Sequence, residues 1–187
     1  LSIEAPSEVS ITQTGSPATG QYSIDVNSLA ASQVLASGSF ASSSTAVGTG
    51  SLTFKIGTPT YASGSSGAYS GFTPDAASTV SVTIDSSNNT LSGIRDAVNA
   101  SGVGITASLV VDGDQTRLLF TADESGAGKA ISITTDDDDG DDVNSSGLSQ
   151  LAYNIDSGSF TSNITEARAS KDASFTLNGL ALTNSSN

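Results

Sequence analysis

Apolar and polar residues alternate in several short stretches of this chain, and this pattern limits its fold more than any other feature. A period of two places the apolar side chains on one face of a β-strand and the polar side chains on the other. Residues typical of turns, such as Gly, Ser, Asn and Asp, separate the stretches. The alternating stretches are residues 21–26, 52–56, 79–85, 103–111, 116–122 and 130–134.

Two dipeptides mark tight turns between apolar strands. Residues 112–113 are Asp-Gly and lie between two alternating stretches, while residues 178–179 are Asn-Gly and lie inside the apolar segment 175–182. Both dipeptides favour the positive φ angles that a type I′ turn requires. They predict β-hairpins, so the sheets are expected to be mostly antiparallel.

One stretch has a helical period instead. Leu91, Ile94 and Val98 recur at the spacing of a single helix face; an Asn or a Thr just before them can cap the start, and a Gly can close the end. We expect an amphipathic helix at about residues 91–100, with this structural face covering a sheet. A short second helix is expected at about residues 147–153. The predicted fold class is α+β, mostly antiparallel β.

Composition excludes several function classes. The 187 residues include no Cys, His or Trp, so a Ser-His-Asp triad and thiolate chemistry are excluded, and the commonest transition-metal ligand is missing. The net charge is −13 and the six basic residues are scattered, which argues against nucleic-acid and anionic membrane surfaces. Carboxylates are plentiful but sit in polar turns, where nothing would raise a pKa. We expect no catalytic residue, no cofactor and no enzymatic activity.

An acidic run, Asp-Asp-Asp-Asp-Gly-Asp-Asp at residues 136–142, is the candidate metal site. It does not match an EF-hand loop, because anchoring its Gly at position six leaves positions one and twelve without carboxylates. A looser calcium site would use Asp137, Asp139 and Asp141. The alternative is a solvated turn that its own charge repulsion keeps open.

Residues 57–78 are rich in Gly, Ser and Thr and have no period, which predicts a long loop. It contains Tyr61, Tyr69 and Phe72, which are candidates for a protein-contact patch. The alternative is that these aromatic side chains fold back over an edge of the core.

The segment around the predicted helix resembles a known module. Residues 94–99, Ile-Arg-Asp-Ala-Val-Asn, and the strands after them look like the "hook IN" module of bacterial axial flagellar proteins. Residues 20–37 and 171–187 are similar to the segments by which the flagellar filament cap family, also called hook-associated protein 2, enters and leaves its middle domains. The expected second helix fits the same pattern.

The resemblance implies a structural assembly protein of the bacterial flagellum. Cap proteins are exported through the flagellar secretion system, form a ring-like oligomer at the extracellular filament tip, and promote flagellin retention, folding and polymerisation. The implied partners are the protein itself, flagellin and hook-filament junction proteins; because some cap proteins act as adhesins, host mucin or glycans are a further candidate. The chain lacks an initiator Met and ends abruptly, so we expect a fragment of the cap plate, without the family's coiled-coil legs.

The resemblance also implies two small β-rich domains, one inserted in the other. The discontinuous outer domain would comprise residues 1–48 and 158–187, and the inserted α+β domain, with the module, residues 49–157. Composition agrees, since the sequence turns to Gly and Ser at both boundaries. Two alternative functions remain: the outer domain of a flagellin or another hook-associated protein, and a glycan-binding module of an adhesin or phage tail.

Overall fold

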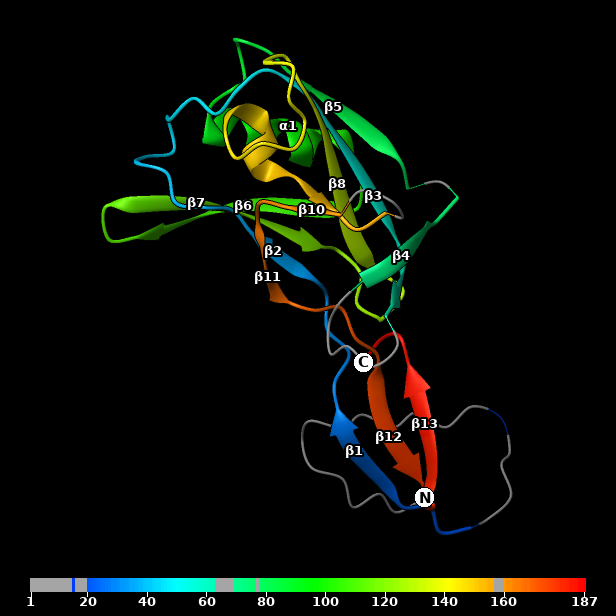
Figure 1. Ribbon diagram of the computed structural model, residues 1–187. Helices are drawn as coiled ribbons and strands as arrows, with labels where there is room; N and C mark the ends of the chain where they lie inside the picture. Colours follow the sequence, from blue (N-terminus) through cyan, green and yellow to red (C-terminus); the bar gives the residue numbers. More distant parts are fainter. Residues whose placement is uncertain (1–14, 16–19, 63–68, 77, 157–159) are drawn as a thin grey trace.

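The computed structural model describes residues 15, 20–62, 69–76, 78–156 and 160–187. Figure 1 shows a wide upper part and a narrow projection below it. We call the projection the stalk; it consists of β1 (Ile24–Ser28), β12 (Ala173–Leu177) and β13 (Leu180–Asn184). The elements from β2 to β11 form the body.

The stalk is one antiparallel sheet in the order β1-β12-β13. Asn178 and Gly179 form the turn between β12 and β13 with φ angles of 50° and 81°. Asn178 is the one non-glycine among the described residues with a positive φ, and Asn tolerates this conformation better than most residues. The hairpin predicted from Asn-Gly is confirmed.

The body contains two sheets. The six-stranded sheet has the order β10-β9-β8-β3-β4, with β5 also paired to β3, and the four-stranded sheet has the order β11-β2-β7-β6. All of these pairs are antiparallel. The strand bounds are β2 Val34–Ala36, β3 Gly50–Tyr61, β4 Tyr69–Pro74, β5 Val80–Ile84, β6 Ile105–Asp112, β7 Gln115–Ala122, β8 Ala130–Asp137, β9 Tyr153–Asn154, β10 Thr161–Ser162 and β11 Thr165–Arg168.

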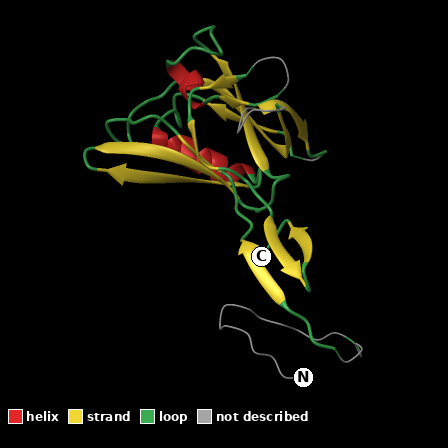
Figure 2. Cartoon of the chain, turned by 60° about the horizontal axis from the view of Figure 1, so that its bottom comes forward, coloured by secondary structure: helices red, strands yellow, loops and turns green. Residues whose placement is uncertain are grey.

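One apolar core lies inside the body. Phe54 of β3 and Phe120 of β7 are fully buried and meet at a centroid distance of 5.5 Å, so the two sheets touch through these rings. Side chains from both sheets and from the helix surround the pair. Figure 2 shows the main helix, in red, running alongside the strands of the body.

Helix α1 (Leu91–Ser101) begins and ends as the sequence predicts. The Thr90 hydroxyl accepts a hydrogen bond from the Gly93 backbone N–H at 3.1 Å, and Gly102 ends the helix in the left-handed conformation with a φ of 66°. Its buried residues are Leu91, Ile94 and Val98.

Asn99 joins this helix to β6. Its amide nitrogen donates to the Ala107 carbonyl at 3.0 Å, and its amide oxygen accepts from the Ala107 N–H at 2.7 Å. Strand β6 lies at the edge of its sheet, so its outer backbone groups need partners. The Asn99 side chain supplies them as a neighbouring strand would.

The predicted α+β fold, mostly antiparallel, is confirmed. The second helix is shorter than predicted: η1 is a 3₁₀ helix over Gly147–Leu151. It ends early because Ala152 is extended and Tyr153 pairs with Ile133 as part of β9. Because Tyr153 is buried and pairs as a strand residue, the helix does not continue through it.

The prediction of a loop over residues 57–78 is wrong for the part that the structure describes. Strand β3 continues to Tyr61 and pairs with β4. Beyond Gly57 neither β5 nor β8 pairs with β3, so Pro59 lies where the sheet has an open edge. A proline is tolerated at such a position because its missing N–H breaks no ladder. The sequence of this region is rich in Gly, Thr and Pro and does not indicate a strand. The strands form here because β3 and β4 pair with each other.

The two-domain division at residues 48 and 158 stays a prediction. Both outer segments contribute to the stalk, where β1 pairs with β12. Both also reach the body, where β2 pairs with β11 and with β7. No helix in the part of the chain that the structure describes is long and apolar enough to cross a membrane.

Replacing Ile94 with Ala tests the role of α1 in the core. The fully buried side chain would leave a cavity, so we expect the free energy of unfolding to fall by about 2–5 kcal/mol in a urea titration. Asp96→Ala, at an exposed position of the same helix, is the control and should change it by less than about 0.5 kcal/mol. Equal effects of the two variants would contradict the assignment.

Candidate functional site

Three tyrosines gather at one end of the six-stranded sheet. Tyr61 and Tyr69 face each other across the β3–β4 pair, with ring centroids 5.2 Å apart and ring planes at 30°. Tyr153 of β9 meets Tyr69 edge-on at 6.4 Å and 86°. Tyr153 is buried, whereas 46% of Tyr61 is exposed. We call these three residues the tyrosine cluster; Tyr61 is its solvent-facing member.

A polar network connects the cluster to the other sheet. The Tyr69 hydroxyl donates to the Glu166 carboxylate of β11 at 2.7 Å. The same carboxylate oxygen accepts from the amide of Gln33, which is fully buried, and the Gln33 amide oxygen accepts from the Ile131 backbone N–H. Gln33 thus satisfies groups from both sheets of the body.

The surroundings of the phenols raise their pKa values. Burial, and next the hydrogen bond to Glu166, raise the pKa of Tyr69 far above 10.0, and burial raises the pKa of Tyr153 to about 12. Burial also raises the pKa of Tyr61, with the Glu166 charge adding to the effect. The phenols therefore stay protonated near neutral pH, and the cluster offers hydrogen bonds and ring surface rather than a base.

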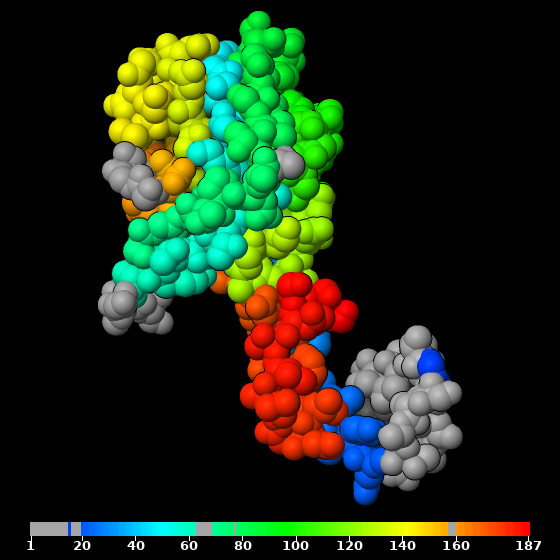
Figure 3. Space-filling model, turned by 90° about the vertical axis from the view of Figure 1, so that its right-hand side faces the viewer, coloured from blue at the N-terminus to red at the C-terminus, as the bar shows by residue number. Residues whose placement is uncertain are grey.

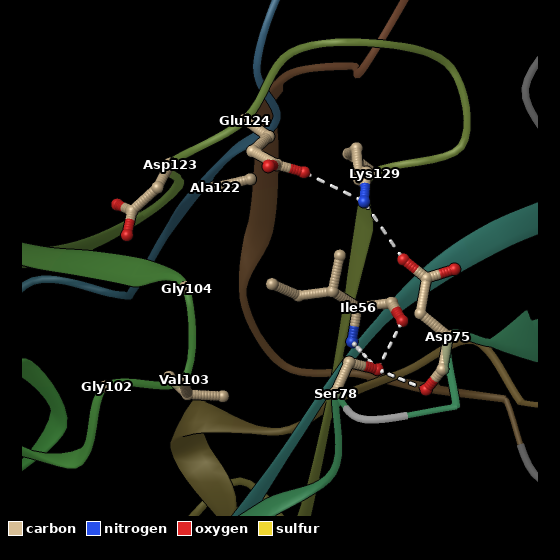
Figure 4. Close-up of a pocket in the computed structure, with 10 residues that line it drawn as sticks. All are labelled: Ile56, Asp75, Ser78, Gly102, Val103, Gly104, Ala122, Asp123, Glu124 and Lys129. Carbon is tan, nitrogen blue, oxygen red and sulfur yellow. Dashed lines mark hydrogen bonds and ion pairs between the residues drawn. The ribbon is translucent and has the colours of Figure 1, made fainter.

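A depression of about 430 Å³ lies where three connections of the body meet. Lys129 stands between two carboxylates, at 2.8 Å from Glu124 and 3.1 Å from Asp75, as Figure 4 shows. These hydrogen bonds, the one to Glu124 first, raise the pKa of the Lys129 ammonium. The lining residues are Ile56, Asp75, Ser78, Gly102, Val103, Gly104, Ala122, Asp123, Glu124 and Lys129.

The charged side chains of this depression form ion pairs that connect neighbouring loops. Lys129 ties the β7–β8 connection to the residues after β4, and the Ser78 hydroxyl donates to the Ile56 and Asp75 carbonyls at 2.6 and 2.9 Å. These contacts tie the loops around the depression to one another.

The β7–β8 connection also holds the stalk. The Ser125 hydroxyl donates to the Ser185 carbonyl at 2.9 Å, and the Ala127 N–H donates to the Asp172 carboxylate at 2.7 Å. Beside them, Asn187 exchanges two hydrogen bonds with the Ala30 backbone, at 2.7 and 3.2 Å. We call this set of contacts the neck.

The acidic run forms the turn that follows β8. Among the described residues, no group of three or more acidic side chains lies close enough together to hold a metal ion. Asp137 is buried and accepts the Ser149 N–H at 2.8 Å, and Asp139 accepts the Asp141 N–H at 2.9 Å, which lowers the pKa of Asp139. These carboxylates accept backbone hydrogen bonds within a turn, and the calcium site at Asp137, Asp139 and Asp141 stays a prediction.

Comparison with known proteins gives the chain its family. No family model matches it. The B-type flagellar hook-associated protein 2 of Pseudomonas aeruginosa is 35% identical over 143 residues, which are 75% of this chain and 26% of that protein. The crystal structure of FliD (HAP2) from Pseudomonas aeruginosa PAO1 matches with a TM-score of 0.67 and 30% identity, over 94% of this chain and 70% of that one. The chain belongs to the flagellar hook-associated protein 2 family.

The D2-D3 domains of FliD from Escherichia coli show the same fold. They match with a TM-score of 0.70 and 26% identity, over 94% of this chain and 80% of that one. The chain spans about a quarter of the length of the curated hook-associated protein 2 relatives that it matches. The predicted family resemblance is confirmed.

In this hook-associated protein 2 relative, the structure separates the aromatic residues that the sequence grouped. Tyr61 and Tyr69 meet, but Phe72 is buried in the core of the body. The sequence did not single out Gln33 or Glu166, which are 133 positions apart and meet only in the folded chain. Gln33 directly precedes the short apolar strand β2, and a polar residue at such a position is too common to indicate a buried network.

Removing the Gln33 amide should destabilise the body. In Gln33→Ala the buried Ile131 N–H loses its acceptor, so we expect the free energy of unfolding to fall by about 1–3 kcal/mol in a urea titration. Gln115→Ala, at an exposed position of β7, is the matched control and should stay within about 0.5 kcal/mol of the parent. A similar loss in both variants would exclude a specific role of the amide.

The tyrosine cluster also predicts a pH dependence. Raised folded-state pKa values mean that the folded chain keeps protons that the unfolded chain releases, so stability is fully present below pH 10 and falls above it. We expect the free energy of unfolding to decline from pH 10 to 12. The decline should be smaller in Tyr69→Phe, whereas Tyr22→Phe, which changes an exposed tyrosine just before β1, should keep the parent slope. An identical decline in all three proteins would contradict the assignment.

Proposed function

We propose that this chain is part of a flagellar filament cap, at the tip of the filament, and that it acts by assembly rather than by catalysis. The observation that carries the proposal is the match to FliD (HAP2) from Pseudomonas aeruginosa, which extends over 94% of the chain at 30% identity. Other solved structures that match are titled flagellar cap protein. The partners would be further cap subunits, flagellin and hook-filament junction proteins, and the chain would be exported and extracellular.

The described surface suits an exposed assembly protein. Most of the basic side chains bond within the chain, and the net charge of −13 keeps the surface strongly acidic. The basic residues with such a bond are Lys55, Arg95, Arg117, Lys129 and Arg168. An acidic surface without a basic patch favours solubility and opposes non-specific adhesion.

Within the proposed cap, Tyr61 is the contact residue that we favour. Its ring is half exposed and is supported from behind by Tyr69, which Glu166 holds by a hydrogen bond. Rigid aromatic side chains are enriched at protein interfaces. A supported exposed ring can therefore contribute to binding a neighbouring subunit or an incoming flagellin at little cost in side-chain entropy.

Genetic replacement tests the proposal. In cells lacking the gene that encodes this chain, we expect hooks without filaments in electron micrographs and unpolymerised flagellin in the medium. The intact gene should restore filaments, and a copy without the codons for residues 20–187 should not, although its product is still exported. Normal filaments in the cells without the gene would overturn the cap role, and full restoration by the shortened copy would show that this chain is not needed for it.

A further inference from the structure

The turn between β12 and β13 contains the one Asn-Gly pair of the chain, Asn178 and Gly179, and both residues are exposed. Figure 1 shows β12 running away from the body and β13 returning, and Figure 3 shows the stalk as a narrow projection, so the turn lies at the end of the stalk away from the body. An Asn followed by Gly loses its side-chain amide more readily than an Asn followed by another residue, because Gly has no side chain that hinders its backbone nitrogen. The turn is therefore a candidate site of chemical modification.

The reaction needs only the two residues of the turn and water. The Gly179 backbone nitrogen attacks Cγ of Asn178, a new C–N bond closes a five-membered succinimide, and the side-chain nitrogen leaves as ammonia with the proton from Gly179. Water then opens the ring at one of its two carbonyl carbons and leaves either Asp or isoaspartate. In isoaspartate the main chain runs through the former side chain. The first step requires the attacking nitrogen and Cγ to approach in the correct orientation.

Ser23, the residue just before β1, holds Asn178 by two hydrogen bonds. The Ser23 N–H donates to the side-chain oxygen Oδ1 of Asn178 at 2.8 Å, and the Ser23 carbonyl accepts from the Asn178 N–H at 2.9 Å. The next pair along the two strands is Ile24 with Leu177. The Asn178 side-chain oxygen thus takes the place of a backbone carbonyl and extends the β1–β12 ladder by one residue. We call these two hydrogen bonds the Asn178 clasp.

The clasp directs the Asn178 carboxamide away from the nitrogen that would attack it. Strands β1 and β13 lie on opposite sides of β12, and Gly179 leads into β13, whereas the carboxamide is bonded toward β1. The backbone of the turn is fixed as well, because Leu177 pairs with Leu180 and the two turn residues have φ angles of 50° and 81°. Ring closure must therefore rotate the carboxamide toward Gly179 and break its hydrogen bond to Ser23.

We propose that Asn178 is a deamidation site that the Asn178 clasp protects, so that the reaction proceeds only when this end of the stalk opens. The ends of strands open locally at a lower free-energy cost than the whole fold. The product isoaspartate lengthens the main chain by one carbon atom, which does not fit the two-residue turn that places Leu177 opposite Leu180. The modification is irreversible, so a transient opening becomes a permanent loss of the hairpin turn. The proposal does not depend on the cap role, because it follows from the Asn-Gly pair and its two hydrogen bonds.

Mass spectrometry of the purified chain after incubation at mildly alkaline pH tests the proposal. Cleavage after Lys171 releases residues 172–187, in which fragmentation locates the deamidated residue. We expect Asn178 to react at least about tenfold more slowly in the folded parent than in urea at a concentration that unfolds it. Ser23→Pro removes the N–H donor of the clasp and keeps the carbonyl, so it should accelerate the reaction of the folded chain about three- to tenfold. Equal rates in the folded and unfolded parent would overturn the proposal.

Ser23→Ala is the matched control, because it changes the same residue but keeps its backbone N–H. Its deamidation rate should stay within about twofold of the parent. In urea the parent and both variants should react equally fast, since the residues next to Asn178 are unchanged. Equal rates of the two folded variants would overturn the proposal. A slower reaction in Ser23→Pro would overturn it too, because the N–H would then activate the carboxamide as an oxyanion hole does.

Hydrogen exchange separates the clasp from a general loss of β1. The Thr176 residue lies opposite Asp25, further along the same ladder. We expect the exchange rate of the Thr176 amide in Ser23→Pro to stay within about twofold of the parent while deamidation accelerates. Equal acceleration of exchange and deamidation would overturn the proposal, since opening of the whole strand would then account for the faster reaction.

Discussion

The contact between Phe54 and Phe120 is the interaction on which the rest of the structure depends. It brings β3 and β7 together, and each of these strands is the hub of its own sheet. Strand β3 pairs with β8 on one side and with β5 and then β4 on the other. Strand β7 pairs with β6 and β2, and β2 brings in β11 from the far end of the chain. With only 5% aromatic residues, the chain places two of its largest side chains where both sheets need them.

The elements that the sequence predicted well are those whose causes are local. Helix α1 carries its own cap and its own terminating glycine, and the Asn-Gly hairpin needs only its turn residues. The β4 strand was missed because its partner, the end of β3, supplies the order that its Gly- and Pro-containing sequence lacks. The network of Gln33 and Glu166 was missed for the same reason at longer range. Pairing across the chain decides such features, and a single sequence does not display it.

In the part of the chain that the structure describes, the apolar core of the body includes no residue of the three stalk strands. Ser125 and Ala127 hold the stalk through a hydroxyl and a backbone N–H, and Asn187 holds Ala30 through its amide. The same β7–β8 connection is anchored in the body by the ion pairs of Lys129. Hydrogen bonds of this kind are directional but individually modest in free energy. Polar contacts therefore fasten the stalk to the body, whereas apolar packing holds the body itself together.

Asn and Gln side chains satisfy backbone groups that no neighbouring strand pairs with. Asn99 takes the place of a strand beside β6, and the Asn88 side chain bonds to the Thr83 carbonyl and the Asp85 N–H at the end of β5. Asn163 donates to the carbonyls of Asn144 and Ser149. Between the sheets, the Gln33 amide donates to Glu166 and accepts from the Ile131 N–H. Each amide offers a donor and an acceptor at the spacing of a peptide group, so it can satisfy an unpaired backbone edge. Much of the polar composition that suggests a binding surface in the sequence thus serves the fold, which leaves exposed rings and apolar faces as the features that point to partners.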